Sequence, residues 1–455
     1  MYLMIRRLFA LVATLAVVTA ASSCVESTRA VATGKGNIRG INAIVTAPEI
    51  GFLIEERSLG NVSFKGSSGF SPFDDLTYNF NFDLLLPGDL RATRLATEFI
   101  DVLADHEYTV VLTGTIANPS SFFWEDPVRE WADTETVFEV IFAHVAPSIA
   151  ELDIYFATPG TLPVLGQSVG SLTSGNRLQG LDFEEAQYEL ILTPKDDPAT
   201  ILYQSVQVGA IAQTQVTVAV FDADPSVPGN VAVNFISGGG ASSVLADVNF
   251  PPQVRTLHAA FATANFDGYF DSDFSNLIYA DIAFQELSPY ADVPAVTTLL
   301  TLTPVGNSGA TIHEDNVIVS AGSRRTTVLA GVPGGLLYFV LLDDARPLET
   351  FPVIRILNVS FSTEFLDIYL LEPGTPIDDD AIAQIRGLPT LFDTGFANST
   401  EGLLELTITL FDDKTPIATP VILDLSNGDI FDIVIVDTVN PGTVEMVVFD
   451  NQQAP

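Results

Sequence analysis

The chain has 455 residues, too many for one hydrophobic core, so several domains are expected. Hydrophobic residues make up 47% and charged residues only 17%, with 32 glycines and 27 prolines, a mixture typical of β-sandwiches with many turns rather than of disorder. The formal net charge of −38 argues against a nucleic-acid partner, because such a chain repels phosphate groups.

The first 23 residues have the layout of a bacterial export signal. Arg6 and Arg7 precede an apolar segment over residues 8–18, and small residues lead into Cys24, the only cysteine. A cysteine at this point is typical of a bacterial lipoprotein, in which it is acylated after cleavage. An uncleaved N-terminal anchor and a plain secretory signal are the alternatives.

We therefore expect residues 1–23 to be removed and residues 24–36 to form a tether on the lipidated Cys24. The lipid anchor makes the membrane one partner of the protein. Val25, rather than Asp, follows the cysteine. By analogy with lipoprotein sorting, this favours the outer membrane, with the protein facing the periplasm or the cell surface.

An internal repeat organises the rest of the chain. The segments at 152–161 (LDIYFATPGT) and 366–375 (LDIYLLEPGT) are identical at seven of ten positions. Nine residues before the aspartate of each segment stands a histidine or an asparagine, which we call the anchor residue. The same spacing finds two further copies, and the four anchors lie 102, 114 and 100 residues apart. This period matches one immunoglobulin-like domain rather than a solenoid repeat.

Each copy is defined by an arginine three residues before the anchor, the anchor itself, and an Asp-x-Tyr pair nine and eleven residues after it. The first copy has Gly51 and Leu53 in place of the pair, and the second has Ile141 in place of the arginine. The candidate site residues are Arg39 and Asn42 in copy one; His144, Asp153 and Tyr155 in copy two; Arg255, His258, Asp267 and Tyr269 in copy three; and Arg355, Asn358, Asp367 and Tyr369 in copy four.

Alternating apolar and polar residues, as in 78–82, 188–192 and 404–408, predict half-buried strands. The apolar stretch 326–342 is interrupted by Pro-Gly-Gly, so we expect strand, turn and strand rather than a membrane helix. The predicted fold is all-β: four tandem immunoglobulin-like antiparallel β-sandwich domains over 37–131, 137–238, 252–346 and 351–450. Short linkers join them, and the glycines at 238–240 predict a hinge between the second and third domains.

The opening Arg-x-x-Asn/His, the Asp-x-Tyr strand and the later Tyr-Thr-Val-Val strand resemble modules of the DUF4397 family, exported bacterial domains often found in tandem on envelope proteins. The resemblance covers most of the chain. It is closest in copies two and four and weakest in copy one. It implies a fold and a cellular address rather than a reaction.

The repeated polar residues have two interpretations. An aspartate and a tyrosine at i and i+2 share one face of a strand and could form a ligand patch, or they could support the fold through hydrogen bonds and ring burial. Repetition in several domains favours the structural role. The anchor alternates between His and Asn, and Asn mimics the hydrogen bonds of neutral imidazole but is a poor ligand for transition metals. Backbone hydrogen bonding is therefore expected there.

No nucleophile elbow, zinc-protease helix or phosphate loop is present in the sequence, so we predict no catalytic residues, no metal site and no cofactor. Weak Ca²⁺ binding by an acidic loop, 267–273 or 378–380, is left open. The predicted function is a non-enzymatic envelope lipoprotein that binds, adheres or acts as a scaffold, with an envelope protein or a glycan as partner. A periplasmic carbohydrate-binding or carbohydrate-active protein and a purely structural spacer are the alternatives.

Overall fold

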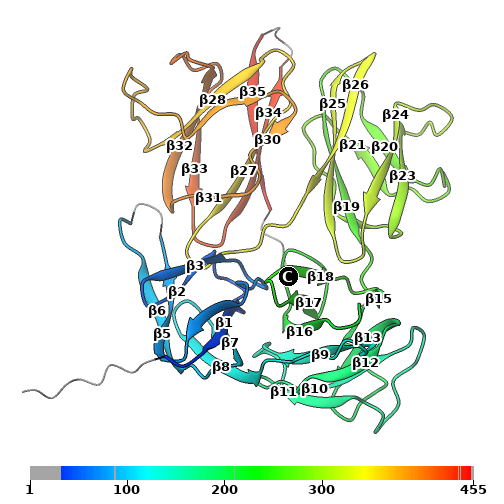
Figure 1. Ribbon diagram of the computed structural model, residues 1–455. Helices are drawn as coiled ribbons and strands as arrows, with labels where there is room; N and C mark the ends of the chain where they lie inside the picture. Colours follow the sequence, from blue (N-terminus) through cyan, green and yellow to red (C-terminus); the bar gives the residue numbers. More distant parts are fainter. Residues whose placement is uncertain (1–31, 87–88, 210, 439, 441, 452–455) are drawn as a thin grey trace, which may run out of the picture.

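The computed structural model describes residues 32–86, 89–209, 211–438, 440 and 442–451 (Figure 1). The export signal and Cys24 lie outside these residues. All regular secondary structure in the described residues is β-strand, which confirms the predicted all-β fold class. No helix long and apolar enough to cross a bilayer occurs in this part of the chain.

The strands form four β-sandwiches, which we number in chain order. Sandwich 1 contains β1 Lys35–Asn42, β2 Ile50–Ile54, β3 Arg57–Val62, β4 Ser71–Asp74, β5 Thr77–Leu84, β6 Thr93–Asp101, β7 His106–Gly114 and β8 Pro119–Pro127. Sandwich 2 contains β9 Val137–His144, β10 Glu151–Ala157, β11 Gly170–Thr173, β12 Leu181–Glu184, β13 Gln187–Pro194, β14 Tyr203–Gln204, β15 Val208–Gly209, β16 Gln215–Asp222, β17 Val231–Ser237 and β18 Ser242–Leu245.

The second half of the chain repeats this plan. Sandwich 3 contains β19 Gln253–Ala260, β20 Phe266–Phe270, β21 Tyr279–Ile282, β22 Ala291–Asp292, β23 Val296–Pro304, β24 His313–Val319, β25 Arg324–Val332 and β26 Gly335–Leu342. Sandwich 4 contains β27 Val353–Asn358, β28 Phe365–Leu371, β29 Ile385–Pro389, β30 Phe392–Asp393, β31 Ala397–Asn398, β32 Gly402–Leu410, β33 Val421–Leu425, β34 Ile430–Asp437 and β35 Val444–Asp450. The strand–turn–strand prediction for 326–342 is confirmed by β25 and β26.

Every sandwich has two sheets. The anchor sheet contains the strand that ends at or near the anchor residue, with the orders β4-β1-β7-β8, β12-β9-β16-β17-β18, β22-β19-β25-β26 and β30-β27-β34-β35. The second sheet, called the outer sheet, has the orders β3-β2-β5-β6, β11-β10-β13-β14, β21-β20-β23-β24 and β29-β28-β32-β33. Each sandwich encloses one hydrophobic core between its two sheets.

One strand pair in each anchor sheet is parallel, which the predicted antiparallel fold did not include. The pairs are β1–β7, β9–β16, β19–β25 and β27–β34. A parallel pair needs a long crossover connection, and here the intervening strands of the outer sheet supply it. The first strand of each copy thereby lies in the middle of its anchor sheet.

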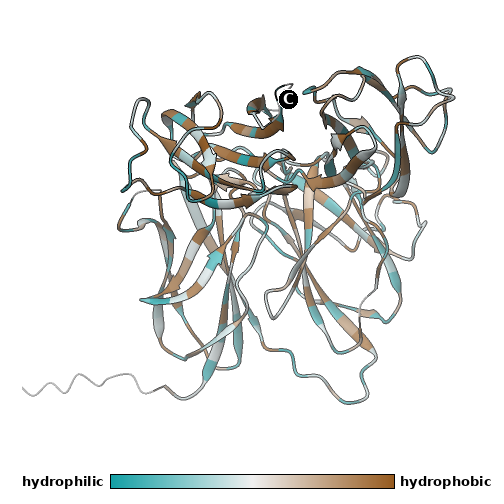
Figure 2. Ribbon diagram, turned by 90° about the horizontal axis from the view of Figure 1, so that it is seen from above, coloured by the Kyte–Doolittle hydropathy of each residue, from teal (hydrophilic) through white to brown (hydrophobic). Residues whose placement is uncertain are grey.

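The anchor sheets are covered on both faces, because sandwiches pack in pairs. Sandwich 1 contacts sandwich 2 through an apolar layer that includes Phe64, Trp124 and Phe221, and sandwich 3 contacts sandwich 4 through a second layer that includes Leu257 and Leu357. Figure 1 shows sandwiches 3 and 4 side by side above sandwiches 1 and 2. Hydrophobic stretches, drawn in brown, run along the strands in Figure 2. The first strand of each anchor sheet is buried at most positions, as expected for a strand that is covered on both faces.

The predicted hinge at 238–240 is wrong, and the second sandwich extends beyond the expected boundary at 238. The segment continues into β18, which pairs with β17. The Phe70 N–H of sandwich 1 donates to the Gly238 carbonyl at 3.0 Å. A Cβ on Gly240 would lie 2.4 Å from the Gly69 nitrogen. These glycines therefore permit close backbone packing between sandwiches 1 and 2 rather than motion.

The segment between sandwiches 3 and 4 joins the two pairs. The guanidinium of the half-buried Arg346 donates to the Val45 carbonyl at 2.8 Å and to the Ala47 carbonyl at 2.7 Å. The Glu349 N–H donates to the Thr46 carbonyl at 2.9 Å. Burial lowers the pKa of Arg346 below its ordinary value. The four sandwiches therefore form a packed assembly rather than tandem domains with a hinge between the second and the third.

Replacing Arg346 with Ala is expected to loosen the contact between the two pairs. The change leaves two carbonyls without a charged donor, and each such hydrogen bond contributes about 1.5–3 kcal/mol. Small-angle X-ray scattering should show a larger radius of gyration, while circular dichroism stays unchanged. Arg91→Ala, at an exposed position, is the control. A scattering profile identical to that of the unaltered protein would show that Arg346 does not hold the pairs together.

Candidate functional site

The four anchor residues are completely buried and bond to backbone. Asn42 Oδ1 accepts from the Ile44 N–H at 3.1 Å, and Asn358 Oδ1 accepts from the Ser360 N–H at 3.1 Å. Their amide nitrogens donate to carbonyls at equivalent positions of the outer-sheet edge strands, at 3.0 Å and 3.3 Å. Each asparagine thus joins the end of an anchor strand to the opposite sheet.

The two histidine anchors make a related set of contacts. The ring of His144 lies 3.3 Å from the Ala146 N–H through Nδ1 and 3.0 Å from the Ile149 carbonyl through Nε2. His258 Nε2 lies 3.3 Å from the Ala264 carbonyl. Burial lowers the pKa of both rings, so the neutral form with the proton on Nε2 fits these partners. Asn42, His144 and Asn358 share the contact to the N–H two residues on, whereas Nδ1 of His258 is buried without a hydrogen-bond partner among the described residues. Asn and His also differ in the carbonyl they reach.

The repeated aspartates connect two loops to the second strand of each copy. Asp267 accepts from the backbone N–H groups of Asp281 and Gly306 at 2.9 and 2.8 Å. Asp367 accepts from those of Gly387 and Asp412 at 2.8 and 3.1 Å. Asp153 likewise accepts from the Asp196 N–H at 2.9 Å and from the Ser171 hydroxyl.

The tyrosines of the Asp-x-Tyr pairs are also buried, on the face of the outer sheet that points away from the core. Tyr269 packs edge-on against Phe274, with ring centroids 5.2 Å apart. Lys414 Nζ lies 5.0 Å from the centroid of the Tyr369 ring and 3.1 Å from its hydroxyl. Burial raises the pKa of Tyr155. The pairs are therefore covered by their own loops rather than presented as an open patch.

The repeated arginines point across the interface between paired sandwiches. Each guanidinium lies over an aromatic ring of its own sandwich: Arg39 over Phe70 at 4.3 Å, Arg255 over Tyr290 at 4.6 Å, and Arg355 over Phe396 at 4.2 Å. The strand registers show that these three rings occupy equivalent positions in their copies. Each belongs to the residue directly before the edge strand that pairs with the first strand of the anchor sheet (β4, β22 or β31). The second sandwich has Ile141 and Gly180 at the two equivalent positions, so it lacks both partners.

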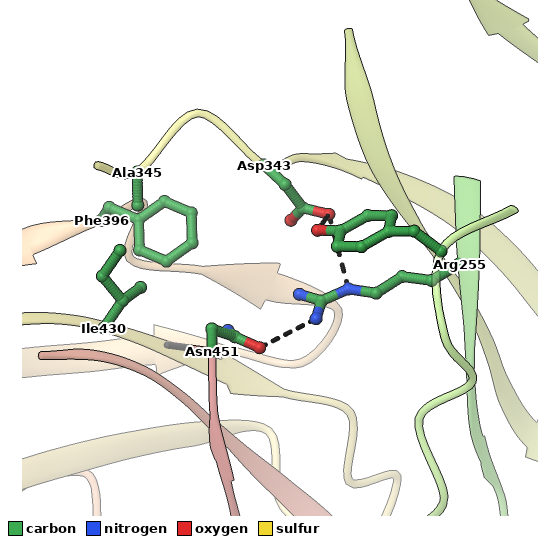
Figure 3. A pocket seen from close by; sticks show the side chains of 7 residues that line it. Arg255, Asp343, Ala345, Phe396, Ile430 and Asn451 are labelled. Carbon is green, nitrogen blue, oxygen red and sulfur yellow. Dashed lines mark hydrogen bonds and ion pairs between the residues drawn. The ribbon is translucent and has the colours of Figure 1, made fainter. Parts of the chain in front are cut away.

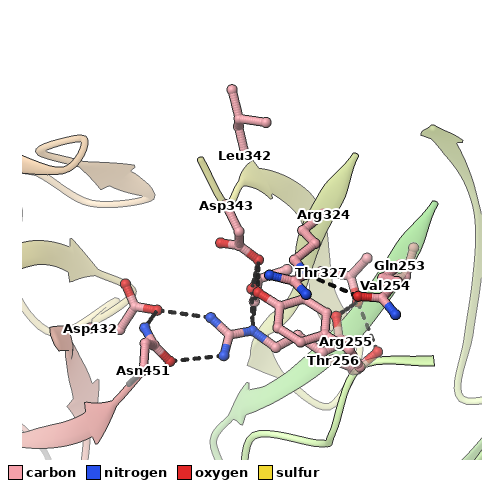
Figure 4. A network of polar contacts seen from close by, with 12 residues as sticks. Gln253, Val254, Arg255, Thr256, Arg324, Thr327, Leu342, Asp343, Asp432 and Asn451 are labelled. Atoms are coloured by element: carbon pink, nitrogen blue, oxygen red, sulfur yellow. Dashed lines mark hydrogen bonds and ion pairs between the residues drawn. The ribbon is translucent and has the colours of Figure 1, made fainter. Parts of the chain in front are cut away.

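Sandwiches 3 and 4 share a buried network of two arginines and two aspartates. Arg355 donates to Asp432 at 2.6 and 3.0 Å and, across the interface, to Asp343 at 2.7 Å. Arg255 of sandwich 3 donates to Asp432 at 3.1 Å and to Asn451 at 2.8 Å, and Figure 4 shows it reaching these two residues of sandwich 4. The network therefore joins the two sandwiches in both directions.

Charge pairing decides the ionisation of this network. Burial alone would lower the pKa of Arg355, but Asp432 and Asp343 outweigh it and hold the pKa above its ordinary value. Burial would likewise raise the pKa of Asp343, but Arg255 and Arg355 keep it below the ordinary value. Arg355 and Asp343 therefore stay charged, and every charged group of the network has a partner of opposite charge.

The first pair uses the same geometry with a single arginine. Arg39 donates to the hydroxyls of Thr109, in its own sandwich, at 2.9 Å and Thr217, in sandwich 2, at 2.6 Å. It also donates to the Ser237 carbonyl at 3.4 Å, as Arg355 does to the Leu342 carbonyl at 2.9 Å. With hydroxyls in place of carboxylates, burial lowers the pKa of Arg39 to about 10, although Glu107 and Asp126 oppose the shift.

A small cavity lies beside the Arg255 network (Figure 3). Its volume is about 30 Å³, and its polar lining includes Arg255, Asp343 and Asn451. This volume is enough for a water molecule but not for an organic ligand. The arrangement fits a contact between sandwiches better than a substrate site.

Trp124 and the two acidic loops also form hydrogen bonds within the protein. Trp124 Nε1 donates to the Gly175 carbonyl of sandwich 2 at 3.0 Å. Asp271 accepts from the Leu299 N–H at 2.9 Å, and Asp378 accepts from the Asp380 N–H at 3.1 Å. Within the described residues, no group of three or more His, Cys, Asp or Glu side chains is arranged to hold a metal ion.

Sequence reasoning missed Asp343, Asp432 and Asn451, which complete the network in the second pair. Asp432 stands beside Arg355 on the neighbouring parallel strand, where Thr109, Thr217 and Thr326 stand in the other copies. Alignment of the closing strands would have shown that only copy four has an acidic residue at this position. The predicted antiparallel fold hid the neighbour relation.

The family described as "Domain of unknown function (DUF4397)" matches residues 26–155 and 252–369, more than half of the chain. The chain belongs to the DUF4397 family. Both DUF4397 matches end at equivalent tyrosines, Tyr155 and Tyr369. Each match covers the first strand of an odd-numbered sandwich and the first strand of the even-numbered sandwich that packs against it. Comparison with curated proteins finds no match.

His144→Asn tests the role of the anchor. The folded protein keeps His144 neutral, so only the unfolded chain takes up its proton as the pH falls below about 6.5, and the free energy of unfolding then decreases. We expect His144→Asn to weaken this acid sensitivity while costing less than about 1 kcal/mol at pH 8. Urea denaturation at pH 5 and pH 8 measures both effects.

His144→Ala is the control for this comparison. It leaves the Ala146 N–H and the Ile149 carbonyl unpaired, which costs about 1–3 kcal/mol for each buried group at either pH. An Asn variant with the same pH dependence as the unaltered protein would contradict the assignment of His144 as a buried neutral anchor.

Asp432→Ala is expected to destabilise the pair formed by sandwiches 3 and 4 by about 3–5 kcal/mol, because two buried arginines lose their shared carboxylate. The urea unfolding transition of the full-length protein measures the change. Asp412→Asn, which removes the partner of Arg386 in a surface ion pair, should leave that transition nearly unchanged. Equal effects of the two substitutions would show that the buried network contributes no more than a surface pair.

Proposed function

We propose that this protein is a non-enzymatic lipoprotein of the bacterial cell envelope in which two sandwich pairs form a rigid scaffold for a binding surface. The observation that carries the proposal is the use of the repeated polar residues inside the fold. The arginines hold paired sandwiches together, and the aspartates and anchors hold loops and sheets together. The plan that the copies share thus serves rigidity, and recognition is left to the loops.

The loops that follow the Asp-x-Tyr strands are the proposed contact surfaces. In sandwich 2 this loop exposes Leu162 and Leu165, in sandwich 3 Phe274 and Leu277, and in sandwich 4 Ile382, whose side chain is 82% exposed. Sandwich 1 has only a two-residue turn at this point. Exposed apolar side chains in the equivalent loops of three copies support a partner of the envelope, either a protein or a glycan.

The experiment compares the full-length protein with Leu162→Ser/Leu165→Ser in bacterial cells. Photo-crosslinking from residue 164 in the same loop should capture a defined partner with the unaltered loop and much less of it with the double variant, since polar side chains remove the apolar contact. The melting temperatures of the purified variants should equal that of the unaltered protein, because these side chains are exposed. Leu410→Ser, at an exposed position outside these loops, is the control.

Cys24→Ser in the same cells tests the proposed lipid anchor. Loss of the protein from the membrane fraction is expected, and protease access to a tag placed at the exposed 378–380 loop separates a surface location from a periplasmic one. Capture that is unchanged in the loop variant, together with turnover or binding on a glycan panel, would favour a carbohydrate-directed protein instead. Unchanged function with silent loop substitutions would favour a spacer.

A further inference from the structure

Sandwich 4 contains an apolar cavity that the other sandwiches fill with their own side chains. The cavity measures about 390 Å³ and lies between the two sheets, lined by residues of β27, β28, β29, β31 and β32. Its size falls in the range of small-molecule pockets, which is about 300–1,000 Å³. An engineered cavity of about 150 Å³, lined by Leu, Ile and Phe, already binds benzene.

Sandwich 2 shows what normally occupies this space. Phe156 stacks on Tyr188 with ring centroids 4.8 Å apart, and Phe183 packs edge-on against Phe156 at 4.9 Å. Phe142 contacts Phe156 at 5.4 Å. The anchor spacing and the strand registers give the equivalents of these four residues in sandwich 4, which are Ile356, Leu370, Ser399 and Leu404. All four line the cavity.

The other two sandwiches also close this position with rings. Sandwich 1 has Phe73 and Tyr78 at the positions of Phe183 and Tyr188, with centroids 5.5 Å apart. Sandwich 3 uses the buried Tyr279, whose hydroxyl donates to the Val254 carbonyl at 2.6 Å. The equivalent of Tyr279 in sandwich 4 is Ile385, which lines the cavity. Only sandwich 4 therefore leaves the space unfilled among the described residues.

We propose that sandwich 4 binds an uncharged, mainly apolar small molecule with two or three aromatic rings in this cavity. Ring shape follows from the side chains that fill the same space in sandwich 2. The absence of charge follows from the lining, since none of the twelve lining residues is charged in a chain of net charge −38. Asn398, Ser399 and Thr400 at the mouth suit one hydrogen-bonding group on the ligand. The proposal does not depend on the scaffold function.

The test uses the exported Cys24→Ser chain, which carries no acyl group and needs no detergent, with the fluorescent probe N-phenyl-1-naphthylamine. This probe is uncharged, has three rings and has one N–H. We expect a saturable fluorescence increase with one site per chain. Ser399→Phe/Leu404→Tyr, which introduces the ring residues of sandwich 2, should weaken binding about tenfold or more. Leu404→Tyr alone is measured as well, so that a folding defect of the double variant does not decide the result.

Two matched variants complete the design. Leu403→Tyr adds the same ring on the opposite, exposed face of β32 and should leave binding unchanged. Phe183→Ser/Tyr188→Leu opens the equivalent space in sandwich 2 and should add a second site. Binding that persists unchanged in the folded cavity-filling variants overturns the proposal. The absence of a saturable signal overturns it too, as expected if the cavity admits only side chains of a partner protein.

Discussion

The burial of both faces of each anchor sheet is the constraint on which the rest of the structure depends. The parallel pairing of β1 with β7, and its equivalents, places two apolar strands in the middle of a sheet. β27 is buried at every position, so one face serves its own core and the other needs a second apolar surface. A neighbouring sandwich with the same sheet supplies that surface, and pairing of copies follows from the fold of one copy.

Apolar sheets pack with little preference for one register, and the arginines add directional bonds to the interface. Arg39 and Arg355 donate to carbonyls at equivalent positions of their partner sandwiches. These bonds fix the lateral position of one anchor sheet relative to the other. The first pair meets the guanidinium with hydroxyls, and the second meets it with carboxylates. Buried ion pairs often add little net stability, because desolvation offsets the attraction. The network in the second pair is therefore better explained as a device for specific pairing than as a source of stability.

Much of the fold could be predicted from local pattern, and most of the interface could not. Alternation in strands such as 188–192 and the Pro-Gly-Gly turn at 333–335 report local structure directly. Repetition located the arginines, anchors and aspartates, because each copy needs them at the same place. The role of Arg355 depends on Asp343 from another sandwich, and no periodicity links the two. The hinge prediction at 238–240 is wrong because glycine permits both flexible linkers and close packing, and only the neighbouring backbone distinguishes these.

Comparison among the four copies shows that the interface arginine and the aromatic ring beside it are present or absent together. Where an arginine enters the interface, an aromatic ring before the edge strand supports its guanidinium. In sandwich 2, which has Ile141, the ring position is Gly180, and a Cβ there would lie 1.6 Å from Glu139 Oε1. Glu139 thus occupies the space of the missing ring and lies 3.8 Å from Arg129 of sandwich 1. Sandwich 2 therefore lacks the interface arginine but contributes Glu139 to a different ion pair at the same interface. What the copies share is a polar contact between sandwiches rather than one particular residue.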